Sequence, residues 1–202
     1  PYNPPAWTAG IGLFSRNHRK SLIIDEHTAF VSGLCISAAW NGKPAKGIEA
    51  WRDTGLALQG PIVQDVLAAF EDTLISQGGT MPPLKRYENE DAMPAGSTRA
   101  RVLATTPANI NTMRLDLNII GLATQNLWIT DAYFMPTRMY VQALINAAKA
   151  GVDGRILVPR TSDIKWIGTV SRTQYRSLLD AGVRVFEWDG TMIHAKTALV
   201  DG

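Results

Sequence analysis

Two copies of one spaced pattern constrain this chain more than any other feature of its sequence. His-Arg-Lys-Ser-Leu-Ile-Ile-Asp occupies residues 18–25, and His-Ala-Lys-Thr-Ala-Leu-Val-Asp occupies residues 194–201. Both copies read His, one residue, Lys, four residues, Asp. The chain contains only three histidines, so chance is a poor explanation for two such matches. We therefore expect one element that occurs twice.

The spacer residues of each copy are mostly apolar, which predicts two buried β-strands. Side chains alternate between the two faces of a strand, so the histidine and the lysine of each copy are expected on one face. The two aspartates, Asp25 and Asp201, have the opposite parity and are expected at the strand ends. The third histidine, His27, lacks this spacing and is expected on the surface in a tight turn.

The paired pattern resembles the phospholipase D superfamily, and its flanks resemble the bacterial cardiolipin synthase-like branch. The segments that carry the branch-level resemblance are Trp51–Gly55, Gln59–Val63, Asp131–Pro136, Arg155–Pro159 and Ala181–Val185. The resemblance covers nearly the whole chain. It implies an α/β, phospholipase D-like fold of two pseudo-twofold-related βα repeats, with mixed, largely parallel sheets flanked by helices.

The same resemblance implies how the chain is divided. Residues 1–76 are expected to be the C-terminal part of the first repeat, and residues 100–202 the N-terminal part of the second, which ends at the second motif. Residues 77–99, rich in glycine, proline and charged residues, are expected to link them. The chain is thus expected to begin inside one repeat and stop inside the other.

Hydrophobic periodicity and turn residues predict the individual elements. In the first repeat, strands are expected near 11–15 and over 18–25, 28–33 and 54–58, with a loop over 40–50 and a helix over 61–76. In the second repeat, strands over 101–105, 127–131, 154–158, 183–187 and 194–201 are expected, with helices over 111–123, 137–150 and 170–181. This alternation predicts a largely parallel sheet covered by helices.

Two imidazoles and two ammonium groups suit displacement at a phosphodiester. One neutral imidazole attacks phosphorus and forms a covalent phosphohistidine, and a second, protonated imidazole delivers a proton to the departing alkoxide. Two lysines offset the charge on the phosphate oxygens, in place of a metal. The sequence has no cysteine pair or His-Glu-x-x-His pattern, so we expect no metal and no other cofactor.

The resemblance assigns roles to the motif residues. The implied catalytic residues are His18, Lys20, Asp25, His194, Lys196 and Asp201. One histidine is the nucleophile, with His18 favoured, and the other is the general acid and base. The lysines bind phosphate, and the aspartates fix the motif strands.

A further carboxylate, Asp53, is expected to orient the imidazole of the nucleophile, the alternative being a cap at the end of a strand or helix. The corresponding acid for His194 is expected beyond Gly202.

Three more residues are expected to bind substrate. Ser32 and Gly33 correspond to a Gly-Ser-x-Asn phosphate-binding element of the family, although Ser and Gly are exchanged here and Cys35 stands at the Asn position. Tyr133, together with Asp131 and residues 159–163, follows a predicted strand. Ligands of open α/β sheets bind beyond the carboxyl ends of the strands, so these residues are expected at a pocket rim.

Charge and hydropathy argue against a dedicated nucleic-acid binder and against a transmembrane helix. The net charge is only +2, lower than a dedicated nucleic-acid binder usually carries, but Arg16, Arg19 and Lys20 are expected to form a local anion site beside the first motif. No stretch approaches 18 apolar residues, so no transmembrane helix is expected.

We therefore expect an enzyme, a phosphatidyltransferase or phospholipase D acting on phospholipids. We expect a bacterial-type protein that is either cytoplasmic or in peripheral contact with a membrane. A phosphodiesterase of the same superfamily acting on nucleic acid, or a non-catalytic binding module, is the alternative.

Overall fold

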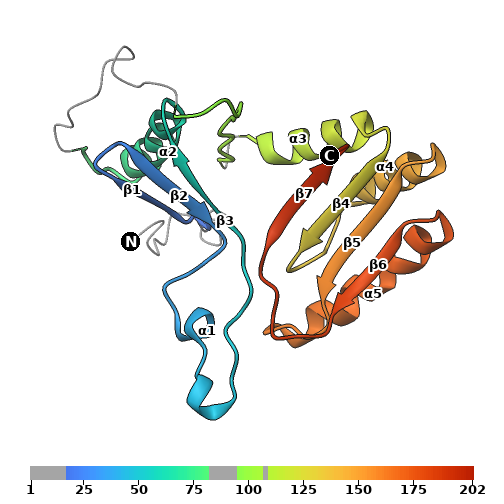
Figure 1. Cartoon of the computed structure of the whole chain (residues 1–202). Helices are drawn as coiled ribbons and strands as arrows, with labels where there is room; N and C mark the ends of the chain where they lie inside the picture. The colour runs from blue at the N-terminus through green and yellow to red at the C-terminus, as the bar shows by residue number, and fades with distance from the viewer. Residues whose placement is uncertain (1–16, 82–94, 107–108) are drawn as a thin grey trace, which may run out of the picture. The chain divides into compact units, whose positions relative to one another are not determined.

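The computed structural model describes residues 17–81, 95–106 and 109–202 (Figure 1). The strand expected near 11–15 lies outside these residues. The chain forms two compact units: unit 1 comprises residues 1–32 and 55–112, and unit 2 comprises residues 33–54 and 113–202. The division into sequence repeats stays a prediction. Compact packing divides the chain differently, because residues 33–54 pack with unit 2.

Unit 1 is built on an antiparallel sheet with strand order β1-β2-β3. Its elements are β1 (Ser21–Ile24), β2 (Thr28–Ser32), β3 (Gly55–Gln59) and helix α2 (Ile62–Ser76). The amide of His27 donates to the carbonyl of Ile24 at 3.1 Å, which closes the predicted tight turn between β1 and β2. Helix α2 buries Val63 and Val66 against Ala29 of β2, and these residues form a small core.

Unit 2 contains a mixed sheet of order β6-β5-β4-β7. Its strands are β4 (Asn126–Asp131), β5 (Asp153–Pro159), β6 (Arg184–Trp188) and β7 (Lys196–Val200). Strands β4, β5 and β6 are parallel, and β7 pairs antiparallel with β4. The predicted α/β class with mixed sheets is thus confirmed. The parallel pairings lie in this sheet, whereas the sheet of unit 1 is antiparallel.

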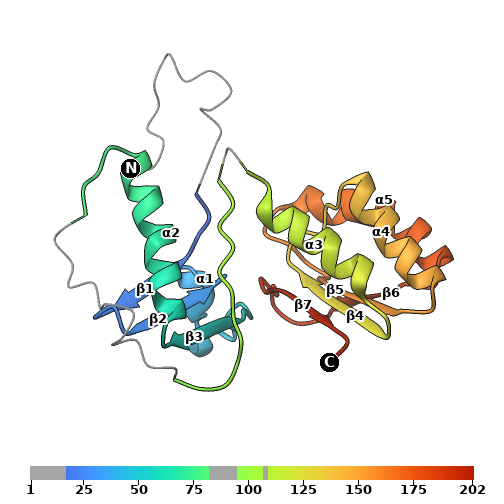
Figure 2. The same ribbon diagram turned by 90° about the horizontal axis from the view of Figure 1, so that it is seen from above.

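Helices α3 (Asn111–Leu122), α4 (Arg138–Lys149) and α5 (Lys165–Asp180) cover one face of the unit 2 sheet, as Figure 2 shows. Burial alternates along β5, where Ile156 and Val158 turn toward the helices. They pack with Ile120 of α3, Leu144 of α4 and Leu178 of α5 in the larger core of the protein. This core fixes the carboxyl end of β4, which borders the candidate site.

Residues 33–54, predicted as a loop over 40–50, contain two short helical turns. These are α1 (Ala38–Asn41), which the Ser37 side chain caps, and the 3-10 turn η2 (Pro44–Lys46). The segment follows β2 of unit 1, makes these turns as part of unit 2 and leads into β3 of unit 1. Its return limb carries Asp53.

Two structural predictions are wrong. The motif strands are not buried: Leu22 of β1 is 58% exposed and Leu199 of β7 is 45% exposed. Both strands lie at a sheet edge and begin later than predicted, so both motif histidines precede them. Residues 101–105 form no strand either, because they join neither sheet and only Thr106 makes an isolated bridge.

In the described part of the chain, no helix combines the length and the hydropathy that crossing a bilayer requires.

Candidate active site

A short parallel backbone pairing brings the return limb of residues 33–54 to the second motif. The amide of Arg52 donates to the carbonyl of Met192 at 3.0 Å, and the amide of His194 donates to the carbonyl of Arg52 at 2.7 Å. Arg52 and Ile193 form the corresponding parallel bridge. These bonds fix the backbone on both sides, so the side chains of Asp53 and His194 meet within unit 2.

Asp53 is the hydrogen-bonding partner of His194. Its Oδ2 atom lies 2.9 Å from Nδ1 of His194 and accepts a hydrogen bond from Nε1 of Trp40 at 3.0 Å. Its other oxygen, Oδ1, accepts from the amide of Thr54 at 2.8 Å. The side chains of the pair are only 4% and 11% exposed, for Asp53 and His194 respectively. The carboxylate is therefore held from several sides, away from solvent.

These hydrogen bonds decide the charge of Asp53. Burial by itself raises the pKa of this carboxyl, but the hydrogen bonds from His194, Trp40 and Thr54 outweigh burial and hold its pKa below the ordinary value. Asp53 is therefore ionised at neutral pH. An anionic acceptor at Nδ1 keeps the proton on that nitrogen. The other nitrogen of His194, Nε2, is therefore the one that can react with a substrate.

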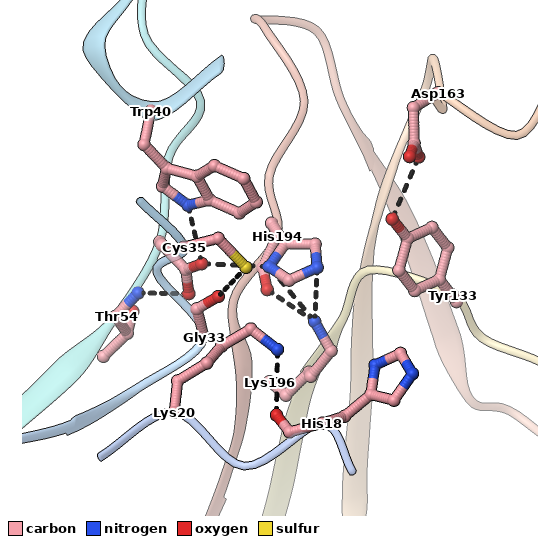
Figure 3. A network of polar contacts seen from close by, with 11 residues as sticks. His18, Lys20, Gly33, Cys35, Trp40, Thr54, Tyr133, Asp163, His194 and Lys196 are labelled. Carbon is pink, nitrogen blue, oxygen red and sulfur yellow. Dashed lines mark hydrogen bonds and ion pairs between the residues drawn. The ribbon is translucent and has the colours of Figure 1, made fainter. Parts of the chain in front are cut away.

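Lys196 lies against the same ring. Its Nζ atom is 3.2 Å from Nε2 of His194 and donates to the carbonyl oxygen of His194 at 2.8 Å (Figure 3). An ammonium group and an imidazole nitrogen thus converge on one small region. An anionic oxygen bound there would contact both groups, which suits a phosphate ester.

Aromatic rings surround the imidazole of His194. The ring centroids of Trp40, Trp51 and Tyr133 lie 5.1, 6.0 and 5.6 Å from that of His194. Figure 3 shows Trp40 on one side of His194 and Tyr133 on the other. The hydroxyl of Tyr133 donates to Oδ1 of Asp163 at 2.9 Å, so these two candidate rim residues lie together. The enclosure limits ring rotation and excludes water from the Asp53 side.

Comparison with known families shows what this part of the chain is similar to. Residues 117–202 match the family described as "Cardiolipin synthase, PLD-like domain". These residues are thus similar to the phospholipase D-like domain of cardiolipin synthases. They include both His194 and Lys196.

Similar full-length proteins support the same relationship over more of the chain. A cardiolipin synthase of Clostridium perfringens (strain SM101 / Type A) is 32% identical over 193 residues, which is 92% of this chain and 40% of that protein. A cardiolipin synthase of Alkalihalophilus pseudofirmus is 34% identical over 190 residues, 92% of this chain and 37% of that protein. The chain therefore spans less than half the length of these relatives.

One solved structure shares the fold across most of the chain. The phosphatidylserine synthase of Haemophilus influenzae Rd KW20 superposes with a TM-score of 0.56 at 16% identity, over 91% of this chain and 52% of that one. At this identity the match shows a shared fold and nothing finer.

The two motif copies share local conformations. Nζ of Lys20 donates to the carbonyl of His18 at 2.8 Å, as Lys196 does to His194. Asp25 has a φ of 51°, in the left-handed region where non-glycine residues are uncommon. Asp201 repeats this with a φ of 52°. The aspartates lie just beyond the strands, as predicted.

Asp201 ties the end of β7 to the start of β4. Its carboxylate accepts hydrogen bonds from the amides of Thr124, Gln125 and Asn126, and from the hydroxyl of Thr124, at 2.7–3.0 Å. The hydrogen bonds from Asn126, Gln125 and Thr124 hold the pKa of Asp201 far below its usual range. The carboxylate thus accepts hydrogen bonds from backbone and hydroxyl donors. Its role in fixing the motif strand stays a prediction.

The carboxylate that contacts His194 is Asp53, whereas Asp53 was expected beside the nucleophile, for which His18 was favoured. Sequence periodicity could not find this pair, since it depends on an isolated bridge rather than on a regular strand. No spacing in the sequence signals the hydrogen bond from Trp40 to Asp53 either.

The carboxylate of Asp53 explains why position 33 is occupied by glycine. A Cβ atom at position 33 would lie 2.5 Å from Oδ1 and 2.8 Å from Oδ2 of Asp53, closer than real contacts allow. The glycine thus makes room for the buried carboxylate. Ser32 ends β2 in unit 1, opposite Gly55. Substrate binding by Ser32, Gly33 and Tyr133 stays a prediction.

The first motif lies in unit 1. His18 is exposed and Lys20 is half-buried ahead of β1. The predicted anion site beside them is wrong for Arg19, whose guanidinium donates instead to the carbonyl of Ala69 and the hydroxyl of Thr73 on α2. Arg16 lies outside the described residues.

Proposed function

We propose that this chain takes part in phosphatidyl transfer between phospholipids, through a covalent phosphohistidine. The observation that carries the proposal is the convergence of Nε2 of His194 and the ammonium group of Lys196, with ionised Asp53 behind the ring. The cardiolipin synthases that the chain resembles point to a phospholipid as the phosphodiester.

In the first step, an imidazole nitrogen of one motif histidine forms a bond to phosphorus. The bond from phosphorus to the headgroup oxygen breaks, and the other histidine, protonated, gives its proton to that oxygen. In the second step, the now neutral histidine takes a proton from an acceptor alcohol. The alcohol oxygen bonds to phosphorus, and the phosphorus–nitrogen bond breaks. Atoms and charges balance without a metal.

We assign the nucleophile to His18 and the acid and base role to His194. Ionised Asp53 stabilises a protonated imidazole at His194, which is the form that a general acid needs. Lys20 and Lys196 offset charge on the phosphate oxygens in this proposal. Joint action of the two motifs on one phosphorus atom is part of the proposal.

A lipid substrate also implies contact with a lipid surface. The segment that carries Asp53 exposes Leu34, Ile36 and Ile48 together with Lys43 and Lys46. Exposed apolar side chains beside lysines suit an anionic bilayer surface. We therefore propose that this segment is the peripheral membrane contact.

The test compares phosphatidylglycerol vesicles with single-stranded DNA as substrates for the wild-type chain and for His18→Ala and His194→Ala. His27→Ala is the matched control, because His27 lies exposed in a turn outside the proposed chemistry. We expect lipid turnover to fall at least about 10³-fold in both motif variants and to stay unchanged in the control. Turnover of DNA in preference to lipid would overturn the substrate, and retained turnover in either motif variant would overturn the mechanism.

A second measurement tests the assignment of the nucleophile. Phospholipid labelled with ³²P at phosphorus is mixed with His194→Ala and quenched in base, which preserves phosphohistidine. We expect label on His18 in this variant and none in His18→Ala. The reverse pattern would exchange the roles of the two histidines.

A further inference from the structure

Tyr133 connects the second motif with a loop of unit 2 that has no part in the proposed chemistry. Tyr133 follows β4, and its amide donates to Oδ1 of Asp131 at 2.9 Å, which fixes the turn at the carboxyl end of this strand. Asp131 is paired with Lys196 in the antiparallel ladder between β4 and β7. The side chain of Lys196 therefore lies near Tyr133, and its ammonium group is over the Tyr133 ring, 5.4 Å from the centroid.

The hydroxyl end of the Tyr133 side chain is held by the loop that follows β5. Oδ1 of Asp163 accepts a hydrogen bond from the Tyr133 hydroxyl at 2.9 Å (Figure 3). The same oxygen accepts from the hydroxyl of Ser162 at 3.2 Å, and the amide of Ile164 donates to Oγ of Ser162 at 3.2 Å. The loop thus has a defined conformation in which one carboxylate oxygen faces the phenol.

The usual role of an aspartate just before a helix is to cap it, but Asp163 is not the cap of α5. The N-cap residue of α5 is Ile164, whose side chain makes no capping hydrogen bond. The contact that Asp163 makes with Tyr133 connects this loop to the candidate active site. We therefore examine what the Tyr133 ring does there.

The Tyr133 ring contacts both functional groups of the second motif. Its plane is at 77° to the His194 ring, with the centroids 5.6 Å apart, which is a favourable edge-to-face arrangement. The ammonium group of Lys196 is held on another side by the carbonyl of His194 at 2.8 Å. The ring and this carbonyl together determine where the ammonium group lies.

The hydrogen bond to Asp163 also affects the charge distribution of the phenol. Burial of Tyr133, its hydrogen bond to Asp163 and the charge of that carboxylate raise the pKa of Tyr133 to about 12. The hydroxyl therefore keeps its proton at neutral pH and donates it to an anionic acceptor. A phenol that donates to an anion has a more electron-rich ring, and such a ring attracts a cation more strongly.

We propose that Tyr133 and Asp163 are positioning residues for Lys196. The ring of Tyr133 holds the ammonium group by a cation–π contact, and Asp163 holds the ring by its hydrogen bond. Because Nζ of Lys196 lies 3.2 Å from Nε2 of His194, loss of the ring would let the ammonium group leave the place where a phosphate oxygen contacts both. The inference rests on the proposed function and adds two residues that act through Lys196 and not on the substrate.

NMR of the lysine side chains tests this positioning without requiring turnover. Protons over the face of an aromatic ring are shifted upfield, so the ε-methylene protons of Lys196 report on the Tyr133 ring. Their resonance is assigned with Lys196→Arg. The test variants are Tyr133→Leu, which removes the ring, Tyr133→Phe, which removes only the hydroxyl, and Asp163→Ala. Asp72→Ala, at an exposed position on α2, is the matched control.

We expect an upfield Lys196 resonance in the wild type that Tyr133→Leu moves to the position of the exposed lysines. Tyr133→Phe should retain most of the upfield shift, Asp163→Ala should reduce it, and Asp72→Ala should leave it unchanged. Asp163→Ala should have no further effect in the Tyr133→Phe background, because the hydroxyl through which it acts is gone. A Lys196 resonance that neither Tyr133→Leu nor Asp163→Ala alters would overturn the inference.

Thermal melts verify that each variant folds. Asp163 lies on an exposed loop, so Asp163→Ala keeps the inference testable even if Tyr133→Leu does not fold.

Steady-state kinetics on phospholipid vesicles separates positioning from direct binding of substrate. We expect Tyr133→Leu to lower kcat on the order of 10-fold and Asp163→Ala about 3-fold, with little change in KM. A raised KM with an unchanged kcat would show that Tyr133 binds the substrate itself, which would overturn the inference.

The two experiments also distinguish this inference from the proposed function. A Lys196 resonance that responds as expected, in a chain without phosphatidyl transfer, would overturn the proposed function and leave the positioning of Lys196 standing. Transfer that Tyr133→Leu does not slow, together with an unchanged Lys196 resonance, would overturn the inference alone.

Discussion

The Nδ1 atom of His194 lies 2.9 Å from the Oδ2 atom of Asp53, although 141 positions separate the two residues. The pair is almost completely buried, and Trp40 and Thr54 hold the carboxylate from other directions. A histidine held this way has a fixed tautomer and a fixed orientation. The pair is therefore the best-defined part of the candidate active site, and most of the predictions below test it.

Replacement of Asp53 by asparagine should uncouple the pair. An amide nitrogen facing Nδ1 would favour the wrong tautomer of His194 and could not stabilise its protonated form. We expect kcat to fall about 10²–10⁴-fold with little change in KM. Steady-state kinetics on phospholipid vesicles measure this, with Asp72→Asn as the control. A kcat within a factor of two of the wild type would show that Asp53 has no part in turnover.

Replacement of Trp40 by phenylalanine should weaken the pair without breaking it. The variant keeps an aromatic ring against His194 but loses the Nε1 donor to Asp53, so the pKa of Asp53 should rise. A hydrogen bond to a charged group contributes about 1.5–3 kcal/mol, so we expect at least about a 10-fold loss of kcat. The acidic limb of the pH–rate profile should also move to higher pH.

The matched control for this change is Trp166→Phe, since Trp166 is exposed on α5. A Trp40 variant with the same pH–rate profile as this control would argue that Trp40 only packs.

Replacement of Gly33 by alanine should displace the carboxylate from a site with no room for a methyl group. The added Cβ would lie 2.5 Å from Oδ1 of Asp53, so either the carboxylate or the backbone must move. We expect kcat to fall toward the value for Asp53→Asn, and the two substitutions to be non-additive in the double variant. Gly121→Ala, in open space on α3, should leave kcat unchanged. Additive losses of kcat in the double variant would show that Gly33 does not act through Asp53.

Replacement of Asp201 by asparagine should lower stability in a pH-dependent way. The folded-state pKa of Asp201 lies below its unfolded value of about 3.9, so its contribution is present above pH 4 and is lost as the pH falls further. We expect the variant to melt roughly 2–4 °C lower at pH 7. The difference should shrink as the pH falls below 4. Calorimetry across this range checks both parts, and a constant difference would contradict the linkage.

Much of the secondary structure could be predicted, because long periodic segments determine it locally. Helix α2 was expected over 61–76 and extends over Ile62–Ser76, and strand β5 was expected over 154–158 and extends over Asp153–Pro159. Burial of the motif strands could not be predicted. Apolar spacers indicate a strand, but they do not reveal that β1 and β7 lie at sheet edges.

The candidate site was predictable in its residue types and not in its pairings. The spacing predicted His194, Lys196 and Asp201, and the resemblance predicted Asp53 as an orienting acid. Which histidine Asp53 contacts depends on a backbone bridge between Arg52 and Ile193, which no local pattern encodes. The same holds for Arg19, whose charge suggested an anion site but whose contacts on α2 are decided by packing.

The passage of residues 33–54 from unit 1 to unit 2 has a consequence for any attempt to dissect this protein. A truncated polypeptide that starts at the predicted linker, residues 77–99, would retain His194 and Lys196. It would lose Asp53, which contacts the imidazole, and Trp40, which donates to Asp53. Such a fragment would keep the residues of the unit 2 sheet, but its His194 would lack the hydrogen-bonding partner that orients the ring. Inactivity of that fragment would therefore not show that the first motif is required, unless residues 33–54 were added back to it.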